Sequence, residues 1–230
     1  MESLIKKLSP NYNDRELSVT PSFIVLHATQ MESASEALER LCDKESQVSA
    51  HYFIHKSGDV YQLVDCKRRA WHAGESLWKG KGDVNSHSIG IEIDNAWEKY
   101  TNEQLISLVE LLKYLCNRYN IDAENIWGHS DVAPHRKEDP GAHFPWEWLG
   151  EKGFGLKKKP QKWKEVCLSE KEAKEILSNI GYNSLGKKAY PLTSILLAFQ
   201  HHFLPENCTG KLDSLTKSTL YALKDYGLSE

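Results

Sequence analysis

NIWGHSDVAPHRKEDPGAHFPW, residues 125–146, begins with a short apolar run that ends in His129 and continues as a loop that carries Lys137 and Asp139. A neutral imidazole and a carboxylate are ordinary zinc ligands, and a lysine beside them can stabilise negative charge that develops on an oxygen. The stretch therefore supplies two of the three protein ligands that a catalytic zinc site requires.

A second apolar run, SFIVLH at residues 22–27, also ends in a histidine, His27. Both runs have the composition of β-strands. Two strands that end in histidines can bring these side chains together at one edge of a sheet. The candidate ligands are therefore His27, His129 and Asp139, with water in the fourth position.

The segment SHSIGIEIDN, residues 86–95, alternates between isoleucines and small or polar residues. Strand side chains alternate between the two faces of a sheet, so Glu92 lies on the face opposite the isoleucines. Zinc-dependent hydrolysis requires a base for the water proton and a donor for the oxyanion. Glu92 is the candidate base and Lys137 the candidate donor, although the spacing alone leaves structural roles open.

The chain has 230 residues, of which 40% are hydrophobic and 27% charged, with a formal net charge of −3. These values are typical of a soluble protein with one well-packed domain and room for a small second one. The charge gives no reason to expect nucleic acid as a partner. No stretch approaches the about 18 apolar residues of a membrane span, and residues 1–7 lack the apolar core of a signal peptide. We therefore expect no membrane span and a cytoplasmic location.

The five cysteines are scattered along the chain, and no two of them are spaced as a CxxC or CxxxC pair. A disulfide framework or a cysteine-based zinc site is therefore not expected, and reduced thiols are the default interpretation.

Hydrophobic periodicity predicts a mixed α/β domain with the element order β-α-β-β-β-α-β. After the first strand, a capping sequence predicts a helix over about residues 34–43, and two short strands form a hairpin. A long helix opens at residues 101–104, and the turn-rich N-terminal segment is expected to be an ordered arm against the domain. The remaining predicted segments are the hairpin strands 51–55 and 60–64, a loop at 66–86, and the arm at 9–15.

The composition changes to Gly, Lys and Pro after Gly150, and the run of lysines at 157–159 is interpreted as a solvated linker. Beyond it, helical stripes predict three short helices that begin at Ser169, near Leu192 and near Leu215. The expected fold is a mixed central β-sheet flanked by helices, followed by a small three-helix domain. The boundaries are 1–150 for the first domain, 151–167 for the linker and 168–230 for the helical domain.

Five motifs together resemble the zinc-dependent N-acetylmuramoyl-L-alanine amidases of the type 2 amidase family, including bacterial AmpD-like and AmiD-like members. The resemblance covers about residues 9–150, and the motifs occur in the family order. They are IVLHAT at 24–29, SAHYFI at 49–54, WHAG at 71–74, SIGIEI at 88–93 and GHSDVAPHRKEDPGAHFPW at 128–146.

This resemblance implies one zinc ion per chain, held by His27, His129 and Asp139, with Glu92 and Lys137 as catalytic residues. The implied reaction is hydrolysis of the amide between the lactyl group of N-acetylmuramic acid, or its 1,6-anhydro form, and L-alanine. The implied partner is peptidoglycan or an anhydromuropeptide. Roles in cell wall turnover and muropeptide recycling follow from the same resemblance.

Further polar and aromatic residues in or beside the family motifs are candidates for the substrate groove. For each of them a packing or surface role is the alternative interpretation. His135 does not correspond to a ligand position of the family and is treated as a bystander. The candidates are His51, Trp71, His72, Asn95 and Arg136.

The tail, LLAFQHHFLPENCTGKLDSLTKSTLYAL at residues 196–223, resembles three-helix peptidoglycan-binding modules. A wall-binding tail would suit the periplasm or cell envelope, which is the alternative to the cytoplasm. A helical appendage that only packs on the first domain is the alternative to glycan binding.

Two other function classes are considered beside the amidase. The first is a non-catalytic peptidoglycan-recognition protein, which typically lacks a metal ligand, whereas all three ligand positions and both catalytic positions are filled here. The second is cysteine-nucleophile hydrolysis, which finds no cysteine in any of the five motifs. The sequence therefore favours the zinc amidase.

Overall fold

The computed structural model describes residues 4–16, 19–156 and 165–227. Its strands are β1 (Leu4–Lys6), β2 (Tyr12–Asp14), β3 (Phe23–Ala28), β4 (Tyr52–Ile54), β5 (Val60–Gln62), β6 (Arg68–Ala70), β7 (Ser88–Ile93) and β8 (Ile126–Gly128). Its α-helices are α1 (Ala34–Cys42), α2 (Val84–His87), α3 (Asn102–Tyr119), α4 (His129–Val132), α5 (Trp146–Glu151), α6 (Glu170–Ile180), α7 (Leu192–Phe203) and α8 (Ser214–Ala222).

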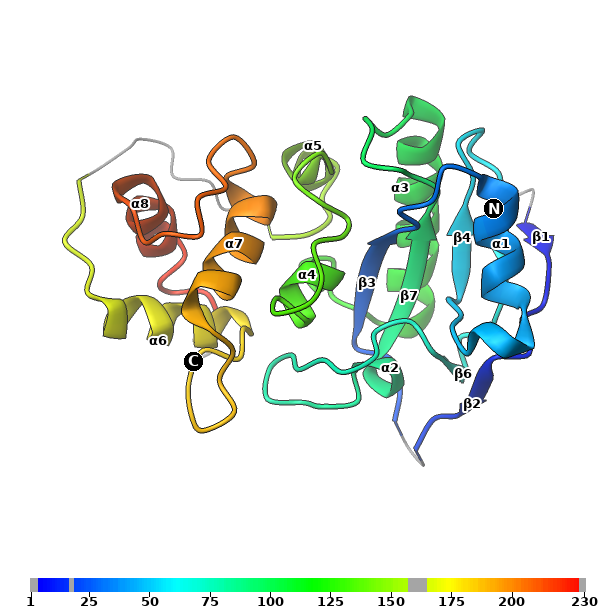
Figure 1. The fold of residues 1–230 in the computed structure, drawn as a ribbon, viewed down its shortest axis with the longest axis horizontal. Coiled ribbons are helices and arrows are strands. Elements are labelled where there is room, and N and C mark those ends of the chain that lie inside the picture. The colour runs from blue at the N-terminus through cyan, green and yellow to red at the C-terminus, as the bar shows by residue number, and fades with distance from the viewer. Residues whose placement is uncertain (1–3, 17–18, 157–164, 228–230) are drawn as a thin grey trace.

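A mostly parallel sheet with the strand order β1-β5-β4-β7-β3-β8 forms the centre of the fold. β3 pairs in parallel with β7 on one side and with β8 on the other, while β4 and β5 form the predicted antiparallel hairpin. A second sheet joins β2 to β6. The expected mixed α/β fold with a central sheet flanked by helices is confirmed, and Figure 1 shows the helices around the sheet.

The two faces of β3 enter different hydrophobic clusters, as its alternating side chains require. Ile24 and Leu26 pack with the isoleucines of β7 and with α3. Phe23 and Val25 pack with Trp127 and with apolar residues of the C-terminal helices. Both faces of β3 are therefore covered, and all six of its residues are buried.

Three helices, α1, α3 and α6, begin at the predicted caps. Ser33 accepts a hydrogen bond from the Glu36 N–H at the start of α1. Thr101 and Gln104 form a reciprocal capping box at α3, and Ser169 forms one at α6. These contacts satisfy N–H groups that have no partner within the helix, which explains why the helices start at these residues.

The three predicted C-terminal helices are present as α6, α7 and α8, and they lie on the β3 side of the sheet (Figure 1). Their buried residues belong to the same cluster as Phe23 and Trp127 of the sheet. The C-terminal helices and the sheet therefore share one hydrophobic core. The division at 151–167 stays a prediction, and residues 157–164 of that segment, with the lysine run, lie outside the described residues.

Several short elements in the N-terminal part were not predicted. The N-terminal arm supplies β1, which pairs with β5, and β2, which pairs with β6. The segment 66–86, expected to be mostly loop, contains β6 and the start of α2. Elements of three or four residues are too short for hydrophobic periodicity to reveal.

No helix in the described ranges is both long enough and apolar enough to cross a membrane.

Candidate metal centre and its pocket

Three predicted ligands meet at the carboxyl ends of β3 and β8. The parallel pairing of these strands brings His27, in β3, next to His129, which follows β8. His27 Nδ1 lies 3.0 Å from His129 Nδ1, and Asp139 Oδ2 lies 3.2 Å and 3.1 Å from these two nitrogens. All three residues are buried. The three donor atoms converge on one point, as the ligands of a metal ion do.

The other ring nitrogens of the two histidines have separate partners. His27 Nε2 lies 3.0 Å from His72 Nδ1. His129 Nε2 donates to the Ala73 carbonyl at 3.2 Å. The backbone N–H groups of His72 and Ala73 both donate to Asn85 Oδ1, at 3.0 Å and 2.7 Å. Contacts of this kind orient metal-binding imidazoles, and here they leave both Nδ1 atoms facing Asp139.

The protonation of the cluster suits a divalent cation. Burial and the neighbouring His129 lower the pKa of His27 to about 4, so its ring is neutral near pH 7. Burial raises the pKa of Asp139, but the contacts with His129 and His27 outweigh it and hold the pKa well below its usual value. Asp139 Oδ1 is buried and has no hydrogen-bond partner within the described residues. Two imidazoles and one under-satisfied carboxylate are the donor set of a zinc site.

Glu92 stands beside this cluster on β7. It is the register partner of His27, so the two side chains leave neighbouring strands at the same level. Burial, followed by the charge of Asp139, raises the pKa of Glu92 to about 8, and Lys137 opposes this shift. Glu92 Oε2 is buried and has no hydrogen-bond partner among the residues the structure describes. The carboxyl group is therefore able to exchange a proton near neutral pH.

A pocket of about 450 Å³ contains the cluster. The predicted catalytic pair, Glu92 and Lys137, lies on its wall together with Trp71 and His72. A second pocket of about 470 Å³ shares Gln30 and Lys137 with the first and extends toward α7. The structure thus brings the five predicted metal and catalytic residues into one cavity.

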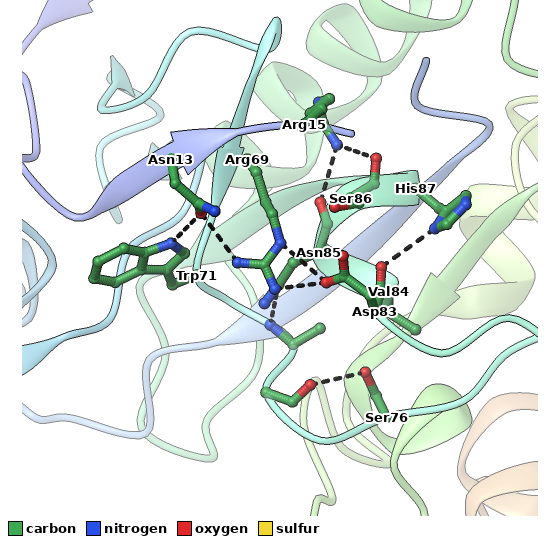
Figure 2. A network of polar contacts seen from close by, with 12 residues as sticks. Asn13, Arg15, Arg69, Trp71, Ser76, Asp83, Val84, Asn85, Ser86 and His87 are labelled. Atoms are coloured by element: carbon green, nitrogen blue, oxygen red, sulfur yellow. Dashed lines mark hydrogen bonds and ion pairs between the residues drawn. The ribbon is translucent and has the colours of Figure 1, made fainter. Parts of the chain in front are cut away.

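Trp71 and His72 are the two predicted substrate residues that line the pocket of the metal cluster. Trp71 is partly exposed, and its indole N–H donates to Asn13 Oδ1 at 2.7 Å, as Figure 2 shows. His72 is mostly buried and, besides His27, contacts Ser88 Oγ at 3.3 Å. Trp71 is therefore a partly exposed aromatic residue on the pocket wall, while His72 is buried against His27.

His51 and Asn95, two other predicted substrate residues, lie inside the protein and do not line the described pockets. His51 Nδ1 accepts the Gly90 N–H at 3.0 Å, and burial and Arg15 lower the pKa of His51 to about 3. Asn95 closes a turn with Glu98, whose N–H donates to Asn95 Oδ1 at 3.0 Å. The contacts of His51 and Asn95 are therefore those of residues that pack inside the protein, which is the alternative interpretation given for them.

Arg136 lines the second pocket, and its Nε donates to the Glu75 carbonyl at 2.8 Å. Its guanidinium also donates to the Ala73 carbonyl, so two of its donors hold the loop beside His72. His135, treated as a bystander, is exposed and stacks on Tyr190 with 4.4 Å between ring centroids.

Figure 2 shows a polar network around the N-terminal arm that the sequence reasoning missed. Arg15 donates through Nη1 to the Asn85 and Ser86 carbonyls at 2.9 Å and 2.5 Å. It also donates to the Cys66 and Ser88 carbonyls at 3.0 Å and 2.8 Å. These carbonyls come from the segment that carries His72, so the arm fixes one side of the pocket. No spacing rule links an arginine to backbone carbonyls 51 to 73 residues away.

Comparisons with known proteins show the family of this chain. The family described as N-acetylmuramoyl-L-alanine amidase matches residues 17–142. The chain is 32% identical to N-acetylmuramoyl-L-alanine amidase AmiD of Escherichia coli over 89% of this chain and 83% of that protein. It is 34% identical to 1,6-anhydro-N-acetylmuramyl-L-alanine amidase AmpD of Escherichia coli over 60% of this chain and 85% of that protein.

Solved structures match over nearly the whole chain. AmiD from E. coli, solved with an anhydro-N-acetylmuramic acid tripeptide, superimposes with a TM-score of 0.80 at 30% identity. That match covers 95% of this chain and 99% of AmiD. AmpDh3 from Pseudomonas aeruginosa, solved with anhydromuramic pentapeptide, matches with a TM-score of 0.80 at 30% identity over 95% of each chain. The chain therefore belongs to the N-acetylmuramoyl-L-alanine amidase family and is an enzyme of that class.

Proposed function

We propose that this amidase uses one zinc ion to hydrolyse the amide between the lactyl group of N-acetylmuramic acid and L-alanine. The proposed substrates are peptidoglycan and 1,6-anhydromuropeptides. The observation that carries the proposal is the convergence of His27 Nδ1, His129 Nδ1 and Asp139 Oδ2 in one pocket with Glu92 and Lys137. The AmiD and AmpDh3 complexes contain anhydromuramoyl peptides, which supports the same substrate class here.

His27, His129 and Asp139 would hold the zinc ion. Three protein ligands of this type leave a coordination position open, which is the catalytic arrangement of zinc. When bound, zinc lowers the pKa of a water molecule to about 7 and polarises a carbonyl group. The neutral state of His27 and the charged state of Asp139 support this assignment.

Glu92 and Lys137 would carry the remaining chemistry. Glu92 would take a proton from the attacking water and deliver it to the nitrogen of L-alanine as that nitrogen leaves. The pKa of about 8 at Glu92 supports this role, because proton exchange is most effective near the working pH. Lys137 would donate a hydrogen bond to the lactyl carbonyl oxygen as negative charge develops on it.

Trp71 would contact the substrate through its exposed face in the pocket. Arg136 would pair with a carboxylate of the stem peptide from the adjoining cavity, since a guanidinium can bind a carboxylate through two hydrogen bonds. His72 would contribute mainly by orienting His27 through their ring contact rather than by binding the substrate. Direct substrate contact by His51 or Asn95 has no comparable support, because neither lines a described pocket.

The test is mass spectrometry of products from purified 1,6-anhydromuropeptides and from intact peptidoglycan, each incubated with and without a zinc chelator. Free stem peptide and unsubstituted sugar are expected, with loss of cleavage on chelation and recovery on addition of zinc. The substrate that is cut faster identifies the preferred form. No cleavage of either substrate by zinc-loaded protein would overturn the proposal and favour a recognition role.

A further inference from the structure

The carboxylate of Asp131 joins the turn that carries His129 to two of the C-terminal helices. Asp131 lies in α4, two residues after His129, and its side chain is 1% exposed. Its Oδ2 accepts the Gly128 N–H at 2.7 Å and lies 2.9 Å from His202 Nδ1, on α7. Its Oδ1 accepts the hydroxyl of Tyr182, just after α6, at 2.5 Å. One buried side chain thus connects three separate segments.

Both donors from the C-terminal helices are held in an aromatic interior. The His202 ring stacks on Trp146 with 3.8 Å between centroids, and Tyr182 meets Trp78 edge-on at 5.1 Å. Burial and the neighbouring Asp131 raise the pKa of Tyr182 well above its usual value, so its hydroxyl remains a donor. A buried carboxylate without such donors is costly, and the place of Asp131 therefore depends on them.

The turn is also packed against the loop that carries the carboxylate ligand. A Cβ atom added at Gly128 would lie 2.7 Å from Pro140 Cδ, so the Gly128 backbone is in close contact with the Pro140 ring. The Ser130 N–H donates to the Asp139 carbonyl at 2.8 Å. A displacement of this turn would therefore shift His129 relative to Asp139.

We infer that Tyr182 and His202 are positioning residues for His129 and act on it through Asp131. The C-terminal helices then complete the outer support of the metal centre. The inference rests on the proposed role of His129 as a zinc ligand. Outer partners of metal ligands typically change metal affinity about 10- to 100-fold when they are removed.

The test uses full-length Tyr182→Phe and His202→Phe variants and the double variant, which keep the rings and remove the donors. Zinc affinity is measured by competition with a chelating dye, and urea unfolding confirms that each protein is folded. The double variant is expected to bind zinc at least about 10-fold more weakly. His202→Asn should recover much of the affinity lost in His202→Phe, because an amide N–H can replace Nδ1 as the donor.

Thr216→Val is the matched control within the same helices. Thr216 is fully buried and accepts a hydrogen bond from Gln200 Nε2 at 2.8 Å, remote from Asp131 in the bonding network. This variant should lose stability while its zinc affinity stays within about twofold of wild type, since distant sites act independently. An unchanged zinc affinity in the folded double variant, or an equal loss in Thr216→Val, would overturn the inference.

A His129→Ala variant separates this inference from the proposed function. Zinc affinity lost in His129→Ala but kept in the double variant would overturn only the positioning role. Zinc affinity kept in His129→Ala would overturn the ligand assignment and the positioning role together.

Discussion

Glu92 and His27 are register partners on the adjacent parallel strands β7 and β3. Their side chains therefore leave the sheet at the same level and on the same face. This relationship places a carboxyl group with a pKa of about 8 beside a candidate metal ligand and within the same pocket as Lys137.

The first prediction concerns Glu92→Gln, which keeps the size of the side chain and removes its capacity to transfer a proton. Turnover of the muropeptide should fall about 10²- to 10⁴-fold, while bound zinc remains near one per chain. Steady-state kinetics and metal analysis on the same sample check this. Wild-type turnover in the folded, zinc-loaded variant would show that Glu92 is not the base.

His27→Ala should abolish tight zinc binding, because it removes one of three protein ligands. Metal content after dialysis is the measurement. His135→Ala is the control, since His135 is exposed and stacks on Tyr190 away from the cluster, and it should retain zinc. Equal zinc contents in the two variants would contradict the ligand assignment.

Glu92 should make the metal-free protein less stable as the pH rises from about 6.5 to 8, relative to a variant that cannot ionise at this position. Folding raises the pKa of Glu92 from 4.5 to about 8, so in this window the folded state holds a proton that the unfolded state has lost. Glu92 should contribute a decrease of about 1–2 kcal/mol in the free energy of unfolding, at a slope of at most about 1.4 kcal/mol per pH unit.

Urea unfolding in the presence of a chelator at several pH values measures this change. His27 and His51, with pKa values lowered to about 4 and 3, are neutral in the folded state but bind protons near pH 6.5 in the unfolded state, so they oppose the effect of Glu92 at the lower end of this window. The Glu92→Gln variant serves as the control, because it cannot ionise at this position. The same pH dependence in wild type and variant would assign the effect to other groups.

Gly90→Ala should destabilise the protein and weaken zinc binding. A Cβ atom at Gly90 would lie 2.4 Å from Cγ of His72, whose ring supports His27. Overpacking of this kind costs about 1–3 kcal/mol, and displacement of His72 should loosen His27. Gly82→Ala is the control, because the nearest atom to its Cβ is 4.0 Å away. Unchanged zinc affinity in Gly90→Ala would show that His72 does not position His27.

Arg15→Lys should cost about 2–4 kcal/mol of unfolding free energy, because lysine has fewer donors and leaves buried carbonyls unpaired. The Arg15 guanidinium donates to four backbone carbonyls beside the pocket. The exposed Arg118→Lys should change stability by less than about 0.5 kcal/mol. Urea unfolding measures the free energy of unfolding of both variants. Similar losses for the two would contradict a structural role for the Arg15 network.

The central strands and the principal helices could be predicted because their signals are local. Alternation in residues 88–93 places the isoleucines in one cluster and Glu92 in the pocket. Strands of three residues, such as β2 and β6, carry too little pattern to be recognised.

The metal cluster was predictable for a different reason. Parallel strands deliver their carboxyl ends to one edge of the sheet, so two apolar runs that end in histidines predict neighbouring side chains. Trp71, His72 and His51 belong to similar motifs, yet only the first two reach the pocket and His51 lies wholly inside. Whether a residue lines the pocket or is buried depends on the segment that packs against it, and this cannot be predicted from the local sequence pattern.

By itself the sequence determined the two faces of the central strands, the starts of α1, α3 and α6, and the five residues expected to bind metal and carry out the chemistry. The tertiary structure alone decided which hydrogen-bond donors support the segments that carry these residues. Tyr182 and His202, for example, contact Asp131 from 51 and 71 residues away in the sequence. The physical reason is that periodicity records the backbone geometry of one element, whereas a buried polar contact depends on the relative placement of two.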